Sequence, residues 1–292
     1  MNPVQYERMW ARGSRTLTIL AMTHPTGALV FGASTVVLCL IAQKAAFDLG
    51  LCICLTVAVM CAQAVSGVVN DLSDIDLDAA AKPWRALPAR LISAQGAWAL
   101  AAAFLALGML AAALISAVSC LLLVFGVATS VLYSTCLKRT RFSWLPYVVA
   151  YPSLPVWVWI STGAFRTEIL TIYLVGAPLV IAVHLVNQLR DYEEDERLGV
   201  RGLVHALGKS RAIAACNSLV VIAPIPLVIG ALLSPRNAFV CVLWGAALVH
   251  WSLALPVILG SKRDHTAVGF RRLFRVLQLS GPLLMGAWLL QM

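Results

Sequence analysis

The 292-residue chain is 61% hydrophobic and only 12% charged, and its mean hydropathy is +0.87. These values lie well outside the range of soluble globular domains and indicate an integral membrane protein. The formal net charge of +9 does not indicate a nucleic-acid-binding protein, because the basic residues are spread through short loops and form neither a stripe nor a long basic arm.

Long apolar segments divide the chain into nine predicted membrane-spanning helices, since about 20 apolar residues are needed to cross a bilayer. The predicted spans are residues 16–42, 47–70, 95–115, 117–137, 143–163, 168–189, 210–233, 237–259 and 272–291. Several of them contain proline, which in membrane helices marks kinks. We therefore expect an all-α fold, a nine-helix transmembrane bundle in which residues 1–292 form a single domain.

The basic residues lie mainly on one side of this predicted topology. Of the 22 Lys and Arg residues, those on the other side are Lys44, Arg166 and Arg236. The positive-inside rule therefore places the N-terminus and the loops after the second, fourth, sixth and eighth spans in the cytoplasm. The odd number of spans places the C-terminus outside, and we expect the protein in the cell (inner) membrane.

A run of four carboxylates, Asp71, Asp74, Asp76 and Asp78, directly follows the second apolar segment. The C-terminal end of a helix disfavours anions, so a cation is expected there. Asn70, Asp74 and Asp78 follow an i, i+4, i+8 spacing, and Asp71, Asp74 and Asp78 follow an i, i+3, i+7 spacing. A continuing helix would therefore present one oxygen-rich face. Without His or Cys the ligand set favours Mg²⁺ or Ca²⁺ over zinc. The alternative for this cluster taken alone is a solvated acidic loop.

The same spacing recurs after the sixth predicted span. Asn187, Asp191 and Asp195 repeat the i, i+4, i+8 pattern, which we interpret as an internal pseudo-repeat with two metal faces. Glu194 lies near Arg190 in the same run and could pair with it. Of the 13 acidic residues in the chain, those outside these two predicted cytoplasmic loops are Glu7, Asp48, Glu168 and Asp264.

Two carboxylate faces at a membrane surface, with basic residues around them, suit a substrate that is both anionic and apolar. Mg²⁺ held by one or two carboxylates commonly completes its shell with water and phosphate oxygens. A polyprenyl diphosphate meets both requirements, with its head at the metals and its tail among the helices. The basic residues in question are Arg85, Lys138, Arg139 and Arg190.

These motifs resemble the signatures of the UbiA superfamily of intramembrane prenyltransferases. The run 70–78, followed by Pro83-Trp84-Arg85-x-Leu87-Pro88, resembles the first signature and is similar to the form in chlorophyll synthase-like members. The run 187–195, followed by Gly199 and Leu207-Gly208, resembles the second signature, and Tyr133 to Lys138-Arg139 resembles the basic element after the fourth helix. The nine-helix plan agrees, so the resemblance covers essentially the whole chain.

The resemblance implies roles for individual residues. Mg²⁺ would draw electron density from the diphosphate until the allylic C–O bond breaks. The implied metal ligands are Asn70, Asp71, Asp74, Asp78, Asn187, Asp191 and Asp195. The residues implied to stabilise the leaving diphosphate are Arg85, Lys138, Arg139 and Arg190. The residues expected to be essential for catalysis are Asp71, Asp74, Asp191, Lys138 and Tyr133.

A pocket for the acceptor or the prenyl tail is predicted near the fifth span. Aromatic rings there could hold an allylic cation by cation–π contacts of roughly 0.5–2 kcal/mol each, although an interfacial aromatic belt is the alternative. Two histidines lie within apolar spans, where a bundle contact is the alternative to a functional role. The candidates for this pocket are His24, Tyr147, Tyr151, Trp157 and His184.

The chain also departs from the family pattern at three places. Many members have Gly-Lys-x-Thr-Leu where this chain has Gly199-Val200-Arg201-Gly202-Leu203, and the Ser-Gly that ends the first motif is Ala89-Arg90 here. The region 22–27 lacks the nearby arginine that is expected in 4-hydroxybenzoate enzymes. A benzoate acceptor is therefore less favoured than other acceptors.

We expect an Mg²⁺-dependent prenyltransferase that ionises a polyprenyl diphosphate and transfers the prenyl group to a small aromatic or quinone-precursor acceptor within the lipid bilayer. The alternative is a UbiA-type class I terpene cyclase, in which the chain's own alkenes attack the cation. A cation transporter is disfavoured, since it would place carboxylates near the bilayer midplane in discontinuous helices. No nucleic-acid partner is expected.

Overall fold

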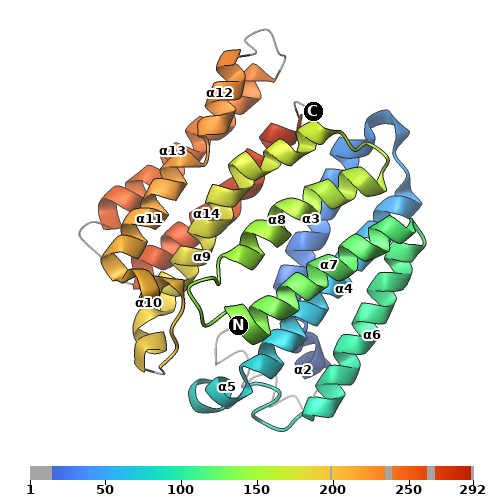
Figure 1. Ribbon diagram of the computed structural model, residues 1–292, viewed down its shortest axis with the longest axis vertical. Coiled ribbons are helices and arrows are strands. Elements are labelled where there is room, and N and C mark those ends of the chain that lie inside the picture. The colour runs from blue at the N-terminus through green and yellow to red at the C-terminus, as the bar shows by residue number, and fades with distance from the viewer. Residues whose placement is uncertain (1–14, 198, 234–238, 262–266, 291–292) are drawn as a thin grey trace. The chain divides into compact units, whose positions relative to one another are not determined.

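The computed structural model describes residues 15–197, 199–233, 239–261 and 267–290. All regular structure in these ranges is helical (Figure 1). The described chain forms two compact units: within the described ranges, unit 1 comprises residues 15–135 and 160–164, and unit 2 comprises the described residues of 136–159 and 165–290. Each unit is described by itself.

The helices of unit 1 come mainly from the first half of the chain. They are α2 (Arg15–Met22), α3 (Pro25–Gln43), η1 (Lys44–Ala46), α4 (Leu49–Ser73), α5 (Ile75–Ala81), α6 (Ala94–Ala113) and α7 (Ala117–Leu132). The π-helical turn η2 (Tyr133–Leu137) follows α7. Side-chain oxygens cap three of the helix starts, a contribution of about 1 kcal/mol each. The caps are Asp48 for α4, Ser93 for α6 and Ser116 for α7.

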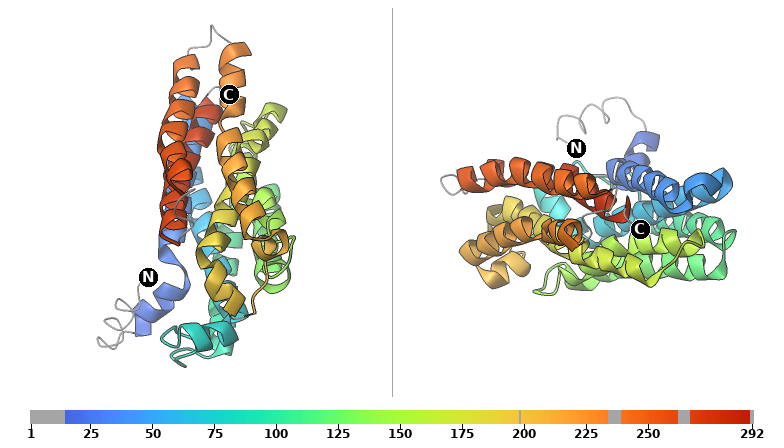
Figure 2. Two further views of the ribbon diagram at one scale, coloured as in Figure 1. Left: turned by 90° about the vertical axis from the view of Figure 1, so that its left-hand side faces the viewer. Right: turned by 90° about the horizontal axis from the view of Figure 1, so that it is seen from above.

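The helices of unit 2 continue to the end of the described chain. They are α8 (Leu145–Ser161), whose last two residues belong to unit 1, η3 (Thr167–Thr171), α9 (Ile172–Arg197), α10 (Leu203–Leu207), α11 (Lys209–Ile222), α12 (Ile225–Leu233), α13 (Val240–Ser261) and α14 (Ala267–Leu290). Within each unit the long helices lie side by side (Figures 1 and 2).

Eight described helical segments are long and apolar enough to cross a membrane, which confirms an integral membrane protein with an all-α fold. They are Pro25–Ala46, Leu49–Ser73, Ala94–Ala113, Ala117–Leu137, Thr167–Arg197, Lys209–Leu233, Val240–Leu259 and Val268–Leu290. The predicted span 143–163 corresponds to α8, which has 17 residues and contains Pro152 and Pro155. This length is at the lower limit for crossing a bilayer, so the predicted count of nine is not confirmed.

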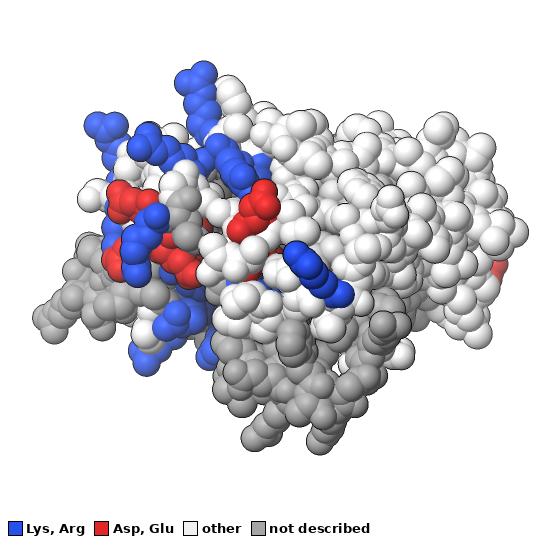
Figure 3. Space-filling model, turned by 90° about the horizontal axis from the view of Figure 1, so that it is seen from below, with Lys and Arg blue, Asp and Glu red and all other residues white. Residues whose placement is uncertain are grey.

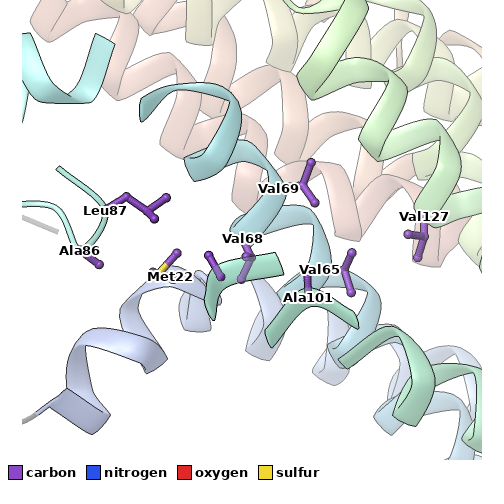
Figure 4. Close-up of a cluster of buried hydrophobic side chains, with 9 residues drawn as sticks. Met22, Val65, Val68, Val69, Ala86, Leu87, Ala101 and Val127 are labelled. Carbon is purple, nitrogen blue, oxygen red and sulfur yellow. The ribbon is translucent and has the colours of Figure 1, made fainter. Parts of the chain in front are cut away.

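The core of unit 1 is built around α4, which packs against α3, α6 and α7. A cluster of buried side chains lies at the end of α4 that leads into the acidic run (Figure 4), and it includes Met22, Val68 and Leu87. Gly67 lets the chain between α2 and α3 approach α4, since a Cβ atom there would lie 2.8 Å from the carbonyl oxygen of Met22. This close approach brings the start of α3 to the acidic run.

The core of unit 2 is built around α9, which packs against α10, α11 and α14. A buried histidine of α13, His250, joins this helix to α14 and α11 through hydrogen bonds to the Ser280 hydroxyl and the Val220 carbonyl, both at 2.9 Å. Pro152 of α8 packs on Gly176 of α9, where a Cβ atom would lie 3.0 Å from the proline ring. These contacts fix α9, which carries the second acidic run.

Candidate active site

The first acidic run lies where α4 ends and α5 begins. Asp74 occupies a turn between the two helices, yet its N–H donates to the Asn70 carbonyl at 3.1 Å and its own carbonyl accepts from the Asp78 N–H at 2.8 Å. The i to i−4 hydrogen bonds therefore continue through the break. This explains why Asp71 and Asp78 remain close enough to share one partner, as the spacing predicts.

That shared partner is Arg85. Its Nη1 donates to Asp71 Oδ1 at 2.9 Å and to Asp78 Oδ2 at 2.7 Å. Lys82 Nζ adds a 3.7 Å contact to the other oxygen of Asp78. The residues Asp71, Asp74 and Asp78 are only 7%, 9% and 4% exposed. Because buried charges persist only when they are paired, this arrangement neutralises much of the acidic run.

His24 also belongs to this cluster. Its Nε2 lies 3.1 Å from Asp71 Oδ1, and its side chain is 42% exposed. The residue has a left-handed backbone, with φ of 49°, at the point where α2 ends and α3 begins. The structure places His24 against a carboxylate of the first motif, and its place in the acceptor or tail pocket stays a prediction.

The second acidic run has a different local structure, because α9 continues unbroken through it to Arg197. Arg190 donates from Nε to Asp191 Oδ1 at 2.9 Å and from Nη2 to Asp191 Oδ2 at 2.7 Å. The guanidinium thus binds the adjacent aspartate in a bidentate manner, instead of the predicted Glu194. The side chains of Arg190 and Asp191 are 29% and 40% exposed.

Asp195 lies one turn further along α9 and is half-buried. The carboxylates of Asp191 and Glu194 are close enough to repel its charge, and Lys138 is close enough to attract it. The structure therefore brings Lys138 to the second motif. Arg139 is exposed beside it, and Tyr133, half-buried, begins η2.

Three of the residues predicted for the acceptor or tail pocket lie together in unit 2. The rings of Tyr147 and Tyr151 are stacked with centroids 5.4 Å apart, and Tyr147 contacts the His184 ring at 4.4 Å. His184 Nε2 lies 2.8 Å from the Ser143 hydroxyl. Trp157 is buried further along α8 and is 6% exposed.

Sequence reasoning missed Gln188, which connects the second motif to the segment after it. Its Nε2 donates to the Ser143 hydroxyl at 3.4 Å and its Oε1 accepts from the Val204 N–H at 3.1 Å. A Cβ atom at Gly202 would lie 2.6 Å from Gln188 Nε2, so a larger residue at this position would displace the Gln188 amide. The sequence contained one sign of this contact, because Gly202 departs from the family pattern.

The donor set fits a magnesium ion, although the carboxylates do not surround a common point. Within the described ranges, no three His, Cys, Asp or Glu side chains are arranged to hold a metal ion, and Asp71 and Asp78 are joined through Arg85 instead. The side-chain donors at the motif positions are oxygens, and two buried carboxylates already converge on one cationic nitrogen. Hard oxygen donors of this kind suit Mg²⁺. On the face drawn in Figure 3, Lys and Arg side chains lie beside Asp and Glu side chains.

Solved structures of UbiA homologues share this fold. A structure of digeranylgeranylglyceryl phosphate synthase has a TM-score of 0.71 and 18% identity, over 94% of this chain and 97% of that one. A UbiA homologue from Aeropyrum pernix K1 has a TM-score of 0.69 and 20% identity, over 90% and 96%. A UbiA homologue from Archaeoglobus fulgidus bound to GPP and Mg²⁺ has a TM-score of 0.67 and 20% identity, over 89% and 99%.

No curated protein matches the sequence significantly, and the resemblance of the first motif to chlorophyll synthase-like members stays a prediction. The model of the UbiA prenyltransferase family matches residues 29–276, which is most of the chain. This protein therefore belongs to the UbiA prenyltransferase family.

Proposed function

We propose that the protein is an Mg²⁺-dependent intramembrane prenyltransferase that ionises a polyprenyl diphosphate and transfers the prenyl group to an aromatic or quinone-precursor acceptor. One observation carries the proposal: three buried carboxylates gather at the end of an apolar helix, and two of them share one guanidinium group. A stable core would not place charges there without a function, because burying them is costly. Family membership supports the same chemistry.

Both acidic runs would hold the metal. The Archaeoglobus fulgidus homologue is bound to GPP and Mg²⁺, and we propose the same kind of ligands for this chain. The metal ligands would be Asn70, Asp71, Asp74 and Asp78 in the first motif and Asn187, Asp191 and Asp195 in the second. Bound Mg²⁺ supplies Lewis acidity that stabilises the charge developing on a leaving diphosphate.

The basic residues of the chain then have defined tasks. Without substrate, Arg85 holds Asp71 and Asp78 together. In the catalytic complex Arg85 exchanges a carboxylate partner for a diphosphate oxygen, and Lys138, Arg139 and Arg190 bind the same anion. Bidentate guanidinium contacts of this kind favour phosphate as well as carboxylate. Tyr133, which precedes Lys138, would support the same anion site.

The membrane arrangement is part of the proposal. We propose that α8 crosses the bilayer as a ninth span, that the whole chain acts as one domain, and that both acidic motifs act on one diphosphate at the cytoplasmic side of the cell (inner) membrane. The asymmetric distribution of Lys and Arg supports this orientation, with the C-terminus outside.

A terpene cyclase is the second candidate function. The stacked rings of Tyr147 and Tyr151 favour it, because aromatic faces stabilise a carbocation as it moves along a prenyl chain. In that case the alkenes of the substrate attack C1 in place of an external acceptor, the diphosphate leaves, and a proton is lost or water adds.

The test is product analysis of purified protein in detergent with Mg²⁺ and geranyl, farnesyl or geranylgeranyl diphosphate. Consumption of the diphosphate only after a phenolic or quinone-precursor acceptor is added supports the transferase. Cyclic hydrocarbons or alcohols released without an acceptor support the cyclase. No Mg²⁺-dependent consumption under either condition would contradict both.

A further inference from the structure

The packing of α14 on α9 brings an aromatic ring to the basic residue of the second motif. The Cζ atom of Arg190 lies over the Phe274 ring, 5.6 Å from the ring centroid. An arginine within about 6 Å of an aromatic face is attracted by the negative charge density of that face. Arg190 therefore has two kinds of partner within unit 2, the Asp191 carboxylate and the face of the Phe274 ring.

The position of Phe274 does not depend on the ion pair. Its neighbours on α14, Leu273 and Leu277, are 3% and 1% exposed, and α14 packs closely along α9. Phe274 itself is half-buried. Because burial of apolar side chains holds this part of α14 in place, the ring is a support that remains when the polar partners of Arg190 change.

Arg190 uses only part of its hydrogen-bonding capacity. Nε and Nη2 donate to the two oxygens of Asp191 at 2.9 and 2.7 Å. A guanidinium group carries further N–H donors on Nη1, and Nη1 has no hydrogen-bond partner among the residues that the structure describes. The Arg190 side chain is 29% exposed, so an anion can approach the remaining donors.

The pairing of Arg190 with Asp191 has to weaken if this carboxylate also binds Mg²⁺, as proposed above. Both carboxylate oxygens accept from the guanidinium. A divalent cation at either oxygen would repel the arginine, since charges a few ångströms apart interact strongly in a partly buried site. Arg190 would thus lose part of its hold on α9 when its charge is needed for the diphosphate.

Phe274 differs from Asp191 because its ring is neutral and binds no metal. A cation over an aromatic ring is held by the face of the ring, whereas the N–H groups of arginine lie in the plane of the guanidinium and remain available to oxygen acceptors. The contact between Arg190 and Phe274 can therefore persist while Asp191 turns to the metal and an anion approaches.

We propose that Phe274 is a positioning residue for the diphosphate site, which holds Arg190 in place while Asp191 changes from an ion-pair partner to a metal ligand. Phe274 acts through Arg190 and does not itself contact the substrate. The inference rests on the proposed function of the second motif, and it gives a role to α14, which contains neither acidic motif.

The test is a double-mutant cycle on GPP binding to the full-length protein in detergent with Mg²⁺, measured by calorimetry. Phe274→Leu keeps an apolar side chain but lacks the aromatic face, and the Kd should rise about three- to tenfold. Phe274→Tyr keeps the face and should bind GPP within about twofold of wild type. In the Arg190→Gln background, Phe274→Leu should cause no further rise in the Kd, because contacting residues that act together are not additive.

The matched control is Phe165→Leu. It makes the same change at an exposed phenylalanine of unit 2 and should leave the Kd for GPP unchanged. A ring that served only for packing would give Phe274→Leu the same effect with and without Arg190. Such additivity, or an unchanged Kd in Phe274→Leu, would overturn the proposal.

The outcome separates this inference from the proposed function. Non-additive GPP binding in a protein that consumes no prenyl diphosphate would support the role of Phe274 and contradict the transferase. Prenyl transfer with the same KM for GPP in wild type and Phe274→Leu would support the transferase and overturn the role of Phe274.

Discussion

The two acidic motifs share one spacing but differ in local structure. In the first motif the helix breaks at Asp74, and Arg85 joins two buried carboxylates from 14 and seven positions further along the chain. In the second motif α9 continues unbroken, and Arg190 binds its partly exposed neighbour Asp191. The comparison shows that identical spacing does not impose the same ion pairing, because burial decides how strongly each carboxylate needs a partner.

The largest expected effect is on catalysis, where the two motifs should be alike. Asp74→Ala and Asp191→Ala should each lower Mg²⁺-dependent turnover by at least roughly 10²–10³-fold, the loss typical of removing one group that stabilises transition-state charge. Asp76→Ala is the matched control, because Asp76 belongs to the same run but is exposed, and it should retain turnover. Wild-type rates in either motif variant would contradict a shared role.

The basic residues of the two motifs should contribute differently to the free energy of unfolding. Arg85→Gln leaves Asp71 and Asp78 buried without the cation they share, and we expect a loss of about 3 kcal/mol in the free energy of unfolding. Arg190→Gln should cost no more than about 1 kcal/mol, because the Arg190–Asp191 pair is substantially exposed. Denaturation of both variants in detergent, followed by circular dichroism, measures the difference. Equal losses would show that burial does not distinguish the motifs.

An intermediate loss of stability is expected at Gly202, in the segment that follows the second motif. Gly202→Ala places a Cβ atom 2.6 Å from Gln188 Nε2, and the forced movement should cost about 1–3 kcal/mol. Combining it with Gln188→Ala should remove part of that cost, since contacting residues are not additive. Gly281→Ala is the control in the same unit, because a Cβ atom there meets nothing within 4 Å. Thermal unfolding of the single and double variants gives the coupling directly.

The smallest effect is expected at His24. Its contact with Asp71 is partly exposed, so His24→Ala should change the free energy of unfolding by less than about 1 kcal/mol. The same denaturation experiment measures it. A loss as large as that of Arg85→Gln would mean that His24, and not Arg85, is the principal partner of Asp71.

The sequence predicts the parts of this structure that depend on local spacing. Apolar length predicts the helices, and the i, i+3, i+7 spacing of Asp71, Asp74 and Asp78 predicts that Asp71 and Asp78 lie close together despite the turn at Asp74. The nine-span count is not confirmed because α8, with two prolines and 17 residues, is shorter than the other spans. Length alone cannot decide whether a helix at this limit crosses the bilayer.

Partners that lie far apart in the chain were not predictable. His24 reaches Asp71 because Gly67 allows a close approach of backbone to helix, and sequence spacing contains no sign of that packing. Arg190 has several carboxylates within reach, so its choice of Asp191 over Glu194 depends on side-chain geometry. The pairing of Gln188 with Gly202 and Val204 likewise depends on how the chain returns after α9.

The most direct test of the account is the Mg²⁺ dependence of GPP binding to wild type, Asp74→Ala, Asp191→Ala and the Asp76→Ala control. If both motifs hold the metal that binds the diphosphate, Mg²⁺ should strengthen GPP binding to wild type and to the control, and this gain should vanish in each of the other two variants. A full Mg²⁺-dependent gain in either Asp74→Ala or Asp191→Ala would contradict the central claim that the two motifs act on one diphosphate.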